Sequence, residues 1–161
     1  DVYKRQLSSL DANKDLMKKE QIRLDELVDY ALDSLDLRKS INVEIKKSLK
    51  KNSICGDFYW LAEAFINIIK NADNRPTCDK IVLSSYKNPL YTSLIIEDNG
   101  GGIEEENMKK IFKRFYKTPD SNGFGIGLAM AKTIVEKNNG EISVSNIDAG
   151  ARFEIKFYNV T

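Results

Sequence analysis

The sequence predicts an α+β domain: a two-layer α/β sandwich with a mixed β-sheet and helices packed on one face. Three observations predict this fold. Some segments alternate apolar and polar residues as strands do, others repeat apolar residues with the period of a helix, and neighbouring strands are joined by short turns. A chain of 161 residues with 42% hydrophobic residues suits one domain with a sizeable core.

The first half of the chain predicts strands and helices in alternation. Residues 22–24 form a short strand, and Asp25 is placed to cap the helix that follows it. Residues 41–45 alternate as a half-buried strand, and a charged turn follows over 48–53. A strong helix then spans 57–72, with an aspartate as its N-cap.

The second half completes the sheet. The patterns predict, in order, strands over 80–86 and 91–97, a partly helical segment over 104–116, a polar loop over 118–122, a helix over 127–138, and strands over 141–145 and 152–157. Asn139-Gly140 ends the last helix, because these residues tolerate a left-handed backbone.

Composition excludes several functions. The net charge is +1, so neither a nucleic acid nor a membrane surface is an expected partner. There is no long apolar run and no signal peptide, which predicts a cytoplasmic domain, although its parent protein could be membrane-anchored. The chain contains no histidine, so it supplies none as a base, metal ligand or phosphoacceptor. Residues 1–6 resemble a translated sequencing adapter and are expected to be non-native.

Asp98 follows an apolar strand and precedes three glycines, Gly100 to Gly102. A carboxylate at a strand end accepts a hydrogen bond from a ligand amine, and glycines leave room for a ring. The alternative is a tight turn, since Asp and Asn before Gly are common in turns.

Glu63, Asn67 and Asn71 are spaced four residues apart, so they share one face of the predicted helix. Carboxylate and amide oxygens suit Mg²⁺ that also binds phosphates. The alternative is a solvated helix face. Two asparagines inside a helix argue against that alternative, because asparagine is a weak helix former.

A second glycine cluster, Gly123, Gly125 and Gly127, opens a helix, where backbone N–H groups and the helix dipole favour phosphate. Its third glycine comes one position too early for a Rossmann fingerprint, and no P-loop lysine is present. A mobile linker is the alternative. Aromatic and basic residues alternate over 112–117, which predicts either a phosphate-facing loop anchor or an ordinary amphipathic helix end.

The order of these motifs resembles the ATP-binding catalytic domain of sensor histidine kinases, in the superfamily shared with Hsp90 and type II topoisomerases. The matching segments are the N box at 63–72, G1 at 98–103, the F box at 111–116, G2 at 123–128, and closing segments at 139–142 and 150–153. The resemblance implies the predicted sandwich together with a mobile ATP lid over residues 103–126.

The resemblance also implies roles for individual residues. The catalytic residues would be Glu63, Asn67 and Lys70, with Glu63 and Asn67 holding Mg²⁺. The nucleotide would be bound by Asn71, Asp98, Gly100, Gly102, Ile103, Phe112, Arg114, Phe115, Lys117, Gly123, Gly125, Ile126, Gly127 and Leu128. Within this set, Asp98 would bind the adenine amino group, and Phe112 and Phe115 would dock the lid.

The sequence departs from the family pattern in three places. Residues 73–76 replace the usual basic or aromatic pair and threonine, and Ala151 replaces a threonine that supports the adenine site. The phosphoacceptor histidine is also missing. Residues 7–19 resemble only the tail of the dimerisation helix with its linker, which makes 20–161 the catalytic domain.

The implied function is delivery of the ATP γ-phosphoryl group to a histidine on a separate dimerisation domain, and from there to a response regulator. The parent would be a homodimer. One alternative is a serine kinase of the same superfamily, such as an anti-sigma factor. Another is a nucleotide-binding regulatory module without transfer activity. Residues 7–24 favour the sensor kinase, because they resemble a helix end and linker.

Overall fold

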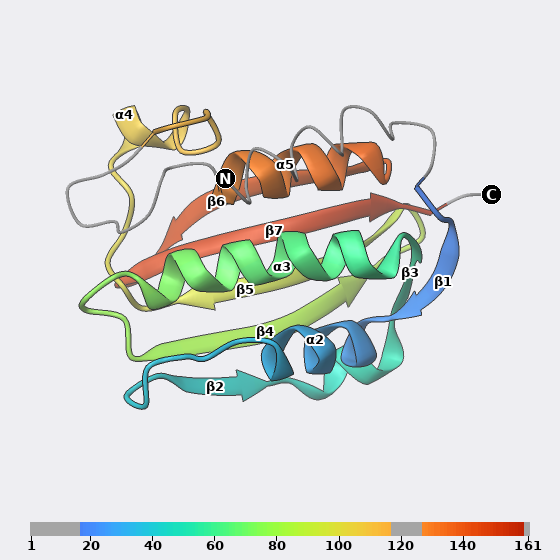
Figure 1. The fold of residues 1–161 in the computed structure, drawn as a ribbon, viewed down its shortest axis with the longest axis horizontal. Coiled ribbons are helices and arrows are strands. Elements are labelled where there is room, and N and C mark those ends of the chain that lie inside the picture. The colour runs from blue at the N-terminus through green and yellow to red at the C-terminus, as the bar shows by residue number, and fades with distance from the viewer. Residues whose placement is uncertain (1–16, 117–126, 160–161) are drawn as a thin grey trace.

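The computed structural model describes residues 17–116 and 127–159. These ranges contain a five-stranded sheet with the order β2-β4-β5-β7-β6 (Figure 1). Its strands are β2 (Asn42–Ile45), β4 (Lys80–Lys87), β5 (Tyr91–Asp98), β6 (Gly140–Ile147) and β7 (Gly150–Tyr158). The β2–β4 pair is parallel and the other pairs are antiparallel, so the predicted mixed sheet is confirmed.

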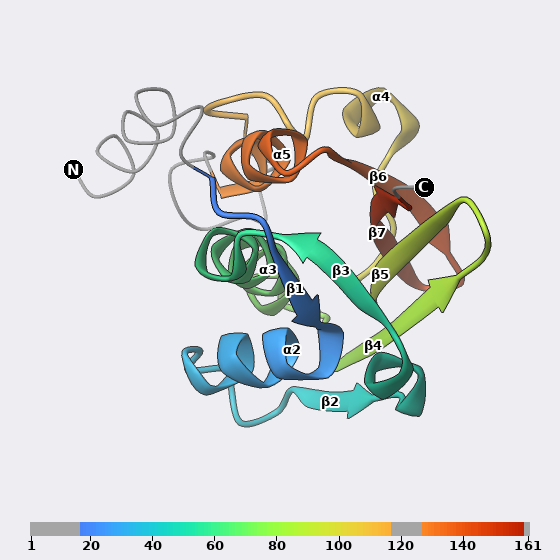
Figure 2. The same cartoon turned by 90° about the vertical axis from the view of Figure 1, so that its right-hand side faces the viewer.

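Three helices cover one face of this sheet, as predicted (Figure 2). They are α2 (Leu24–Asp33), α3 (Phe58–Asp73) and α5 (Gly127–Lys137). The central helix, α3, places Phe65, Ile68 and Ile69 in the core, where they are fully buried. Full burial of each such side chain contributes about 1.5–3 kcal/mol.

Helix α3 begins where the sequence predicts. Asp57 is its N-cap, and the Asp57 carboxylate accepts a hydrogen bond from the Trp60 backbone N–H at 3.2 Å. The helix ends at Asp73, three residues before Pro76, whose ring cannot continue a helix. Both ends of α3 are therefore encoded locally.

The prediction that Asp25 caps α2 is wrong. The N-cap is Arg23, which makes no side-chain cap, and the Leu24 N–H donates instead to the Asn52 carbonyl at 3.1 Å. Asp25 lies in the first turn and pairs with Arg23 at 2.8 Å. A backbone group from a distant segment thus replaces the local side-chain cap.

The charged turn predicted over 48–53 is also only partly correct. Residues Lys47–Lys51 form a 3₁₀ helix, and β3 (Ser53–Gly56) follows it. This strand pairs antiparallel with β1 (Glu20–Arg23) in a separate two-stranded sheet. The four residues of β3 are too few to show a clear periodicity, and the partner strand is distant in sequence. No local pattern therefore predicted β3.

Candidate nucleotide site

The predicted base-binding carboxylate, Asp98, is the last residue of β5, between β4 and β7 in the sheet. Its register places it opposite Ile81 of β4. Its side chain is 1% exposed. A turn residue does not need a buried carboxylate. The burial of Asp98 therefore favours the interpretation that it binds a ligand over the interpretation that it only forms a turn.

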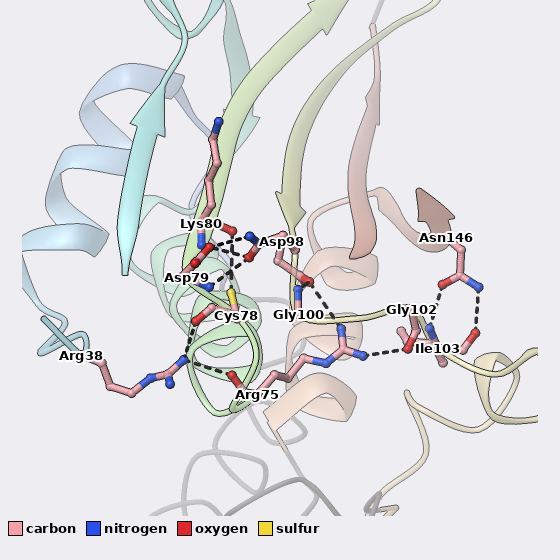
Figure 3. A network of polar contacts seen from close by, with 11 residues as sticks. Arg38, Arg75, Cys78, Asp79, Lys80, Asp98, Gly100, Gly102, Ile103 and Asn146 are labelled. Atoms are coloured by element: carbon pink, nitrogen blue, oxygen red, sulfur yellow. Dashed lines mark hydrogen bonds and ion pairs between the residues drawn. The ribbon is translucent and has the colours of Figure 1, made fainter. Parts of the chain in front are cut away.

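The surroundings of Asp98 hold its carboxylate from several sides (Figure 3). The Gly100 N–H donates to Oδ1 at 2.9 Å, and Nη1 of Arg75 lies 3.4 Å from the same oxygen. Burial raises the pKa of Asp98, while the Gly100 N–H, the Arg75 guanidinium and the Ala151 N–H lower it. Ala151, despite lacking a hydroxyl, therefore supports the carboxylate through its backbone.

Gly150 allows the β6–β7 turn to pack directly on the end of β5. A Cβ added at Gly150 would lie 1.6 Å from the Asp98 carbonyl oxygen, a distance that no side chain tolerates. The neighbouring Ala149 has a φ of 61° and accepts a hydrogen bond from the Gly101 N–H at 2.9 Å. Close backbone packing from β7 therefore shapes the turn that follows Asp98.

Asn146 of β6 holds the backbone of Ile103, where the predicted lid begins. Its Oδ1 accepts from the Ile103 N–H and its Nδ2 donates to the Ile103 carbonyl, both at 2.8 Å (Figure 3). A Cβ at Gly102 would lie 3.0 Å from the same Oδ1, so the clamp needs a small residue there. Gly102 and Ile103, both predicted to bind nucleotide, are thereby held beside Asp98.

The polar stripe of α3 is partly buried. Asn67 is 4% exposed, whereas Glu63 and Asn71 on the same face are half-buried. The Nδ2 of Asn67 is buried and has no hydrogen-bond partner among the described residues. A buried donor without an acceptor costs free energy of folding, and a bound ligand would supply the missing acceptor.

The first residue of α5 lies next to this unpaired amide. A Cβ at Gly127 would come 3.6 Å from Oδ1 of Asn67, an ordinary contact. The N-terminus of α5 therefore faces Asn67, and helix N-termini attract anions through their free N–H groups and dipole. The two features together suit a phosphate group.

The donor set also fits Mg²⁺ held jointly with phosphates. Within the described residues no cluster of three or more acidic, cysteine or histidine side chains is found. Magnesium commonly binds one or two protein oxygens and takes its remaining ligands from phosphates and water. The oxygens of Glu63 and Asn67 suit that arrangement.

The predicted lid anchors behave differently from each other. The Phe112 ring packs edge-on against Phe153 of β7 at 6.2 Å between centroids, and Nζ of Lys132 lies 5.9 Å above it. Phe115 is 67% exposed with a φ of 66°, so the expectation that it docks the lid is not met. The described part of the lid also contains a short helix, α4 (Glu105–Met108).

Three of the remaining predicted residues lie in the described part of the chain. Lys70 is exposed on the last turn of α3, Arg114 is exposed, and Leu128 packs on the core at the start of α5. Lys117, Gly123, Gly125 and Ile126 lie outside the described residues. A cleft of about 990 Å³ lies at the opposite end of β5, near Thr92, and none of the predicted site residues within the described ranges lines it.

Sequence reasoning missed two site residues. In the sequence, Arg75 differs from its neighbours only as part of a departure from a family pattern, although its guanidinium contacts Asp98. Asn146 carried no signal, because one asparagine in an exposed strand is unremarkable and its clamp on Ile103 spans distant segments. Gly150 had a weak signal as the first residue of a closing segment.

The chain belongs to the histidine kinase-, DNA gyrase B- and HSP90-like ATPase family, whose profile matches residues 56–160. Within that family it is an ATP-binding domain of the sensor histidine kinase type. The fold and the buried strand-end carboxylate agree with this assignment. No helix within the described ranges combines the length and hydropathy of a membrane span.

Curated relatives are sensor kinases. Sensor protein RprX of Bacteroides fragilis is 29% identical over 93% of this chain and 31% of the relative. Sensor protein kinase WalK of Staphylococcus aureus is 33% identical over 89% of this chain and 37% of the relative. The chain thus spans about a third of the length of these relatives.

Solved structures agree. The mycobacterial sensor histidine kinase MprB superposes with a TM-score of 0.74 at 25% identity, covering 86% of this chain and 97% of that one. The catalytic domain of histidine kinase ThkA, in a nucleotide-free form, gives a TM-score of 0.75 at 24% identity, covering 88% of this chain and 97% of that one. The ThkA likeness supports the fold.

Proposed function

We propose that this domain binds ATP together with Mg²⁺ and delivers the γ-phosphoryl group to a histidine on a separate dimerisation domain of a homodimeric sensor kinase. A response regulator then receives the phosphoryl group. The observation that carries the proposal is the Asp98 carboxylate at the end of β5, which is 1% exposed and accepts the N–H of Gly100 in the glycine turn that follows. Its remaining lone pairs can accept from a ligand amine.

The residues divide into two groups by chemistry. At the base end, Asp98 accepts the adenine amino group, while Gly100 and Gly102 let Arg75 and Asn146 pack closely beside it. At the phosphate end, Asn67 and the N-terminus of α5 bind phosphate, with Asn71 beside them. Bound Mg²⁺ neutralises charge on the phosphates.

Positioning and charge neutralisation account for most of the catalysis in phosphoryl transfer. Glu63 and Asn67 supply oxygens for the metal, and Lys70 and Arg114 are exposed cations placed to approach polyphosphate. The lid, from Ile103 onwards, would exclude water once nucleotide is bound. Its root is held by Asn146 and its ring anchor is Phe112.

The test mixes the chain with labelled ATP, Mg²⁺ and a separately produced dimerisation domain from its own parent. We expect acid-labile, base-stable label on that domain. The chain itself should carry no such label, because it contains no histidine. Transfer should quicken with concentration, since the tether that normally supplies a millimolar effective concentration is absent.

Other outcomes separate the alternatives. Label on a serine of a partner protein would replace the histidine-kinase assignment with the serine-kinase alternative. ATP binding without transfer to any supplied histidine domain would indicate a regulatory nucleotide-binding module.

A further inference from the structure

Backbone hydrogen bonds hold Arg75 in place just after the end of α3. Its N–H donates to the Ala72 carbonyl at 3.1 Å, and its carbonyl accepts from the Cys78 N–H at 3.0 Å. Arg38 braces the same segment: Nε contacts Asp73 at 3.0 Å, and Nη2 donates to the carbonyls of Arg75 and Cys78, both at 3.0 Å. The Arg75 side chain therefore starts from a rigid backbone.

The Arg75 guanidinium bridges two parts of the base pocket (Figure 3). Nη1 lies 3.4 Å from Oδ1 of Asp98, and Nη2 donates to the Gly102 carbonyl at 3.0 Å. The side chains of Arg75 and Asp98 are 19% and 1% exposed, so water screens this pair weakly. A Cβ at Gly100 would lie 3.1 Å from the Arg75 Cβ, which shows how closely the stem packs.

The acceptor capacity of Asp98 is not exhausted by these contacts. A carboxylate offers about four lone-pair positions. The Gly100 N–H, the Arg75 guanidinium and the Ala151 N–H stabilise the charged form. At least one position remains for a ligand amine, provided that the carboxylate is ionised.

We propose that Arg75 is the positioning residue of the base pocket, which keeps the Asp98 carboxylate ionised and ties it to the Gly102 carbonyl at the root of the lid. A protonated Asp98 would lose its charge and part of its acceptor capacity. Arg75 thus acts through Asp98 rather than on the nucleotide. This inference rests on the proposed function, because it deepens the base-binding role of Asp98.

The other groups around Asp98 do not replace Arg75. Burial, followed by the Asp98 charge, raises the pKa of the Cys78 thiol, so Cys78 stays neutral at physiological pH. The backbone N–H groups of Asp79 and Lys80 donate to Oδ1 of Asn99, the residue after Asp98. The guanidinium of Arg38 donates to the Asp73 carboxylate and to the carbonyls of Arg75 and Cys78.

The experiment compares three variants by calorimetric ADP titration from acidic to mildly alkaline pH. Arg75→Met removes the charge but keeps an aliphatic stem over Gly100, whereas Arg75→Lys keeps the charge. Arg23→Met is the matched control, because the Arg23 side chain is 54% exposed and pairs with Asp25 outside the site. Thermal melts establish that each variant folds.

We expect Arg75→Met to lower ADP affinity roughly tenfold at neutral pH, as loss of a charge-supported acceptor would. The pH at which half of the affinity is lost should move upwards. Arg75→Lys should recover most of both effects, and Arg23→Met should match the parent chain. Unchanged or tighter ADP binding by Arg75→Met, or an equal loss at every pH, would overturn the proposal.

A second readout separates this inference from the proposed function. The Asp98 carboxyl carbon, titrated by NMR without nucleotide, should show a higher pKa in Arg75→Met than in the parent. An unmoved Asp98 pKa refutes the positioning role, whatever the nucleotide result. A parent chain that binds no ADP, with the Asp98 pKa moved as expected, refutes the proposed function alone.

Discussion

At the scale of single residues, we infer that Asp98 serves nucleotide binding rather than stability. Burial raises its pKa, so the folded chain holds the proton to a higher pH than the unfolded chain does. The stability that this proton contributes is fully present below the unfolded pKa and is lost as pH rises through the folded pKa. Ionisation of this buried carboxylate therefore lowers the stability of the nucleotide-free domain, compared with ionisation of a freely exposed carboxylate.

Asp98→Asn should leave the nucleotide-free domain at least as stable as the parent near neutral pH, because it removes the cost of the buried charge. ADP affinity should fall by about ten- to a hundredfold, the loss of a charge-assisted hydrogen bond of roughly 1.5–3 kcal/mol. Calorimetry and thermal melts measure both. Asp29→Asn on the exposed part of α2 is the control, and undiminished affinity in Asp98→Asn would make Asp98 a turn residue.

Asn67 is a second buried polar residue for which we propose a binding role. Asn67→Ala removes both the unpaired Nδ2 and the oxygen proposed for Mg²⁺. We expect it to weaken magnesium-dependent ATP binding far more than magnesium-free adenosine binding. Titrations with both ligands make the comparison internally controlled, and equal losses would contradict the metal role.

At the scale of elements, turns from two strands build the pocket together. The turn after β5 and the β6–β7 turn are in backbone contact through Gly101 and Ala149, and Asn146 joins β6 to the root of the lid. Each segment is ordinary alone. Their packing sets the space beside Asp98, so glycine is required where backbones approach most closely.

Gly150→Ala should destabilise the domain, because its Cβ would clash with the Asp98 carbonyl oxygen at 1.6 Å. Overpacking of this kind costs about 1–3 kcal/mol. Gly127→Ala is the matched control, since its Cβ meets Asn67 only at 3.6 Å and should cost no stability. Urea unfolding measures both, and equal stability of the two variants would show that the β6–β7 turn yields easily.

At the scale of the whole molecule, nucleotide binding should stabilise the fold. A ligand at a hundred times its Kd adds about 2.7 kcal/mol. For a domain of this size, each kcal/mol raises Tm by about 2–4 °C. We expect ATP with Mg²⁺ to raise Tm by roughly 5–11 °C at that concentration.

A thermal melt with and without ATP checks this expectation, with GTP as the control ligand because its 6-oxo group cannot donate to Asp98. An equal shift by both nucleotides would place recognition on the phosphates alone.

The fold class, the ends of α3 and the strands β4 to β7, to within two residues at each end, follow from the sequence alone, as does the order of the predicted motifs. These features are local: periodicity sets helices and strands, and caps and prolines set helix ends. The family resemblance then implies roles for Asp98 and Asn67, which local patterns left open.

Only the tertiary structure decided how distant segments complete the site. It paired β3 with β1, satisfied the start of α2 with the Asn52 carbonyl, and left Phe115 exposed while Phe112 docked. It also brought Arg75 to Asp98 and Asn146 to Ile103. The physical reason is that these contacts join segments that are distant in sequence. Side-chain periodicity predicts local structure and does not predict which distant segments pack together.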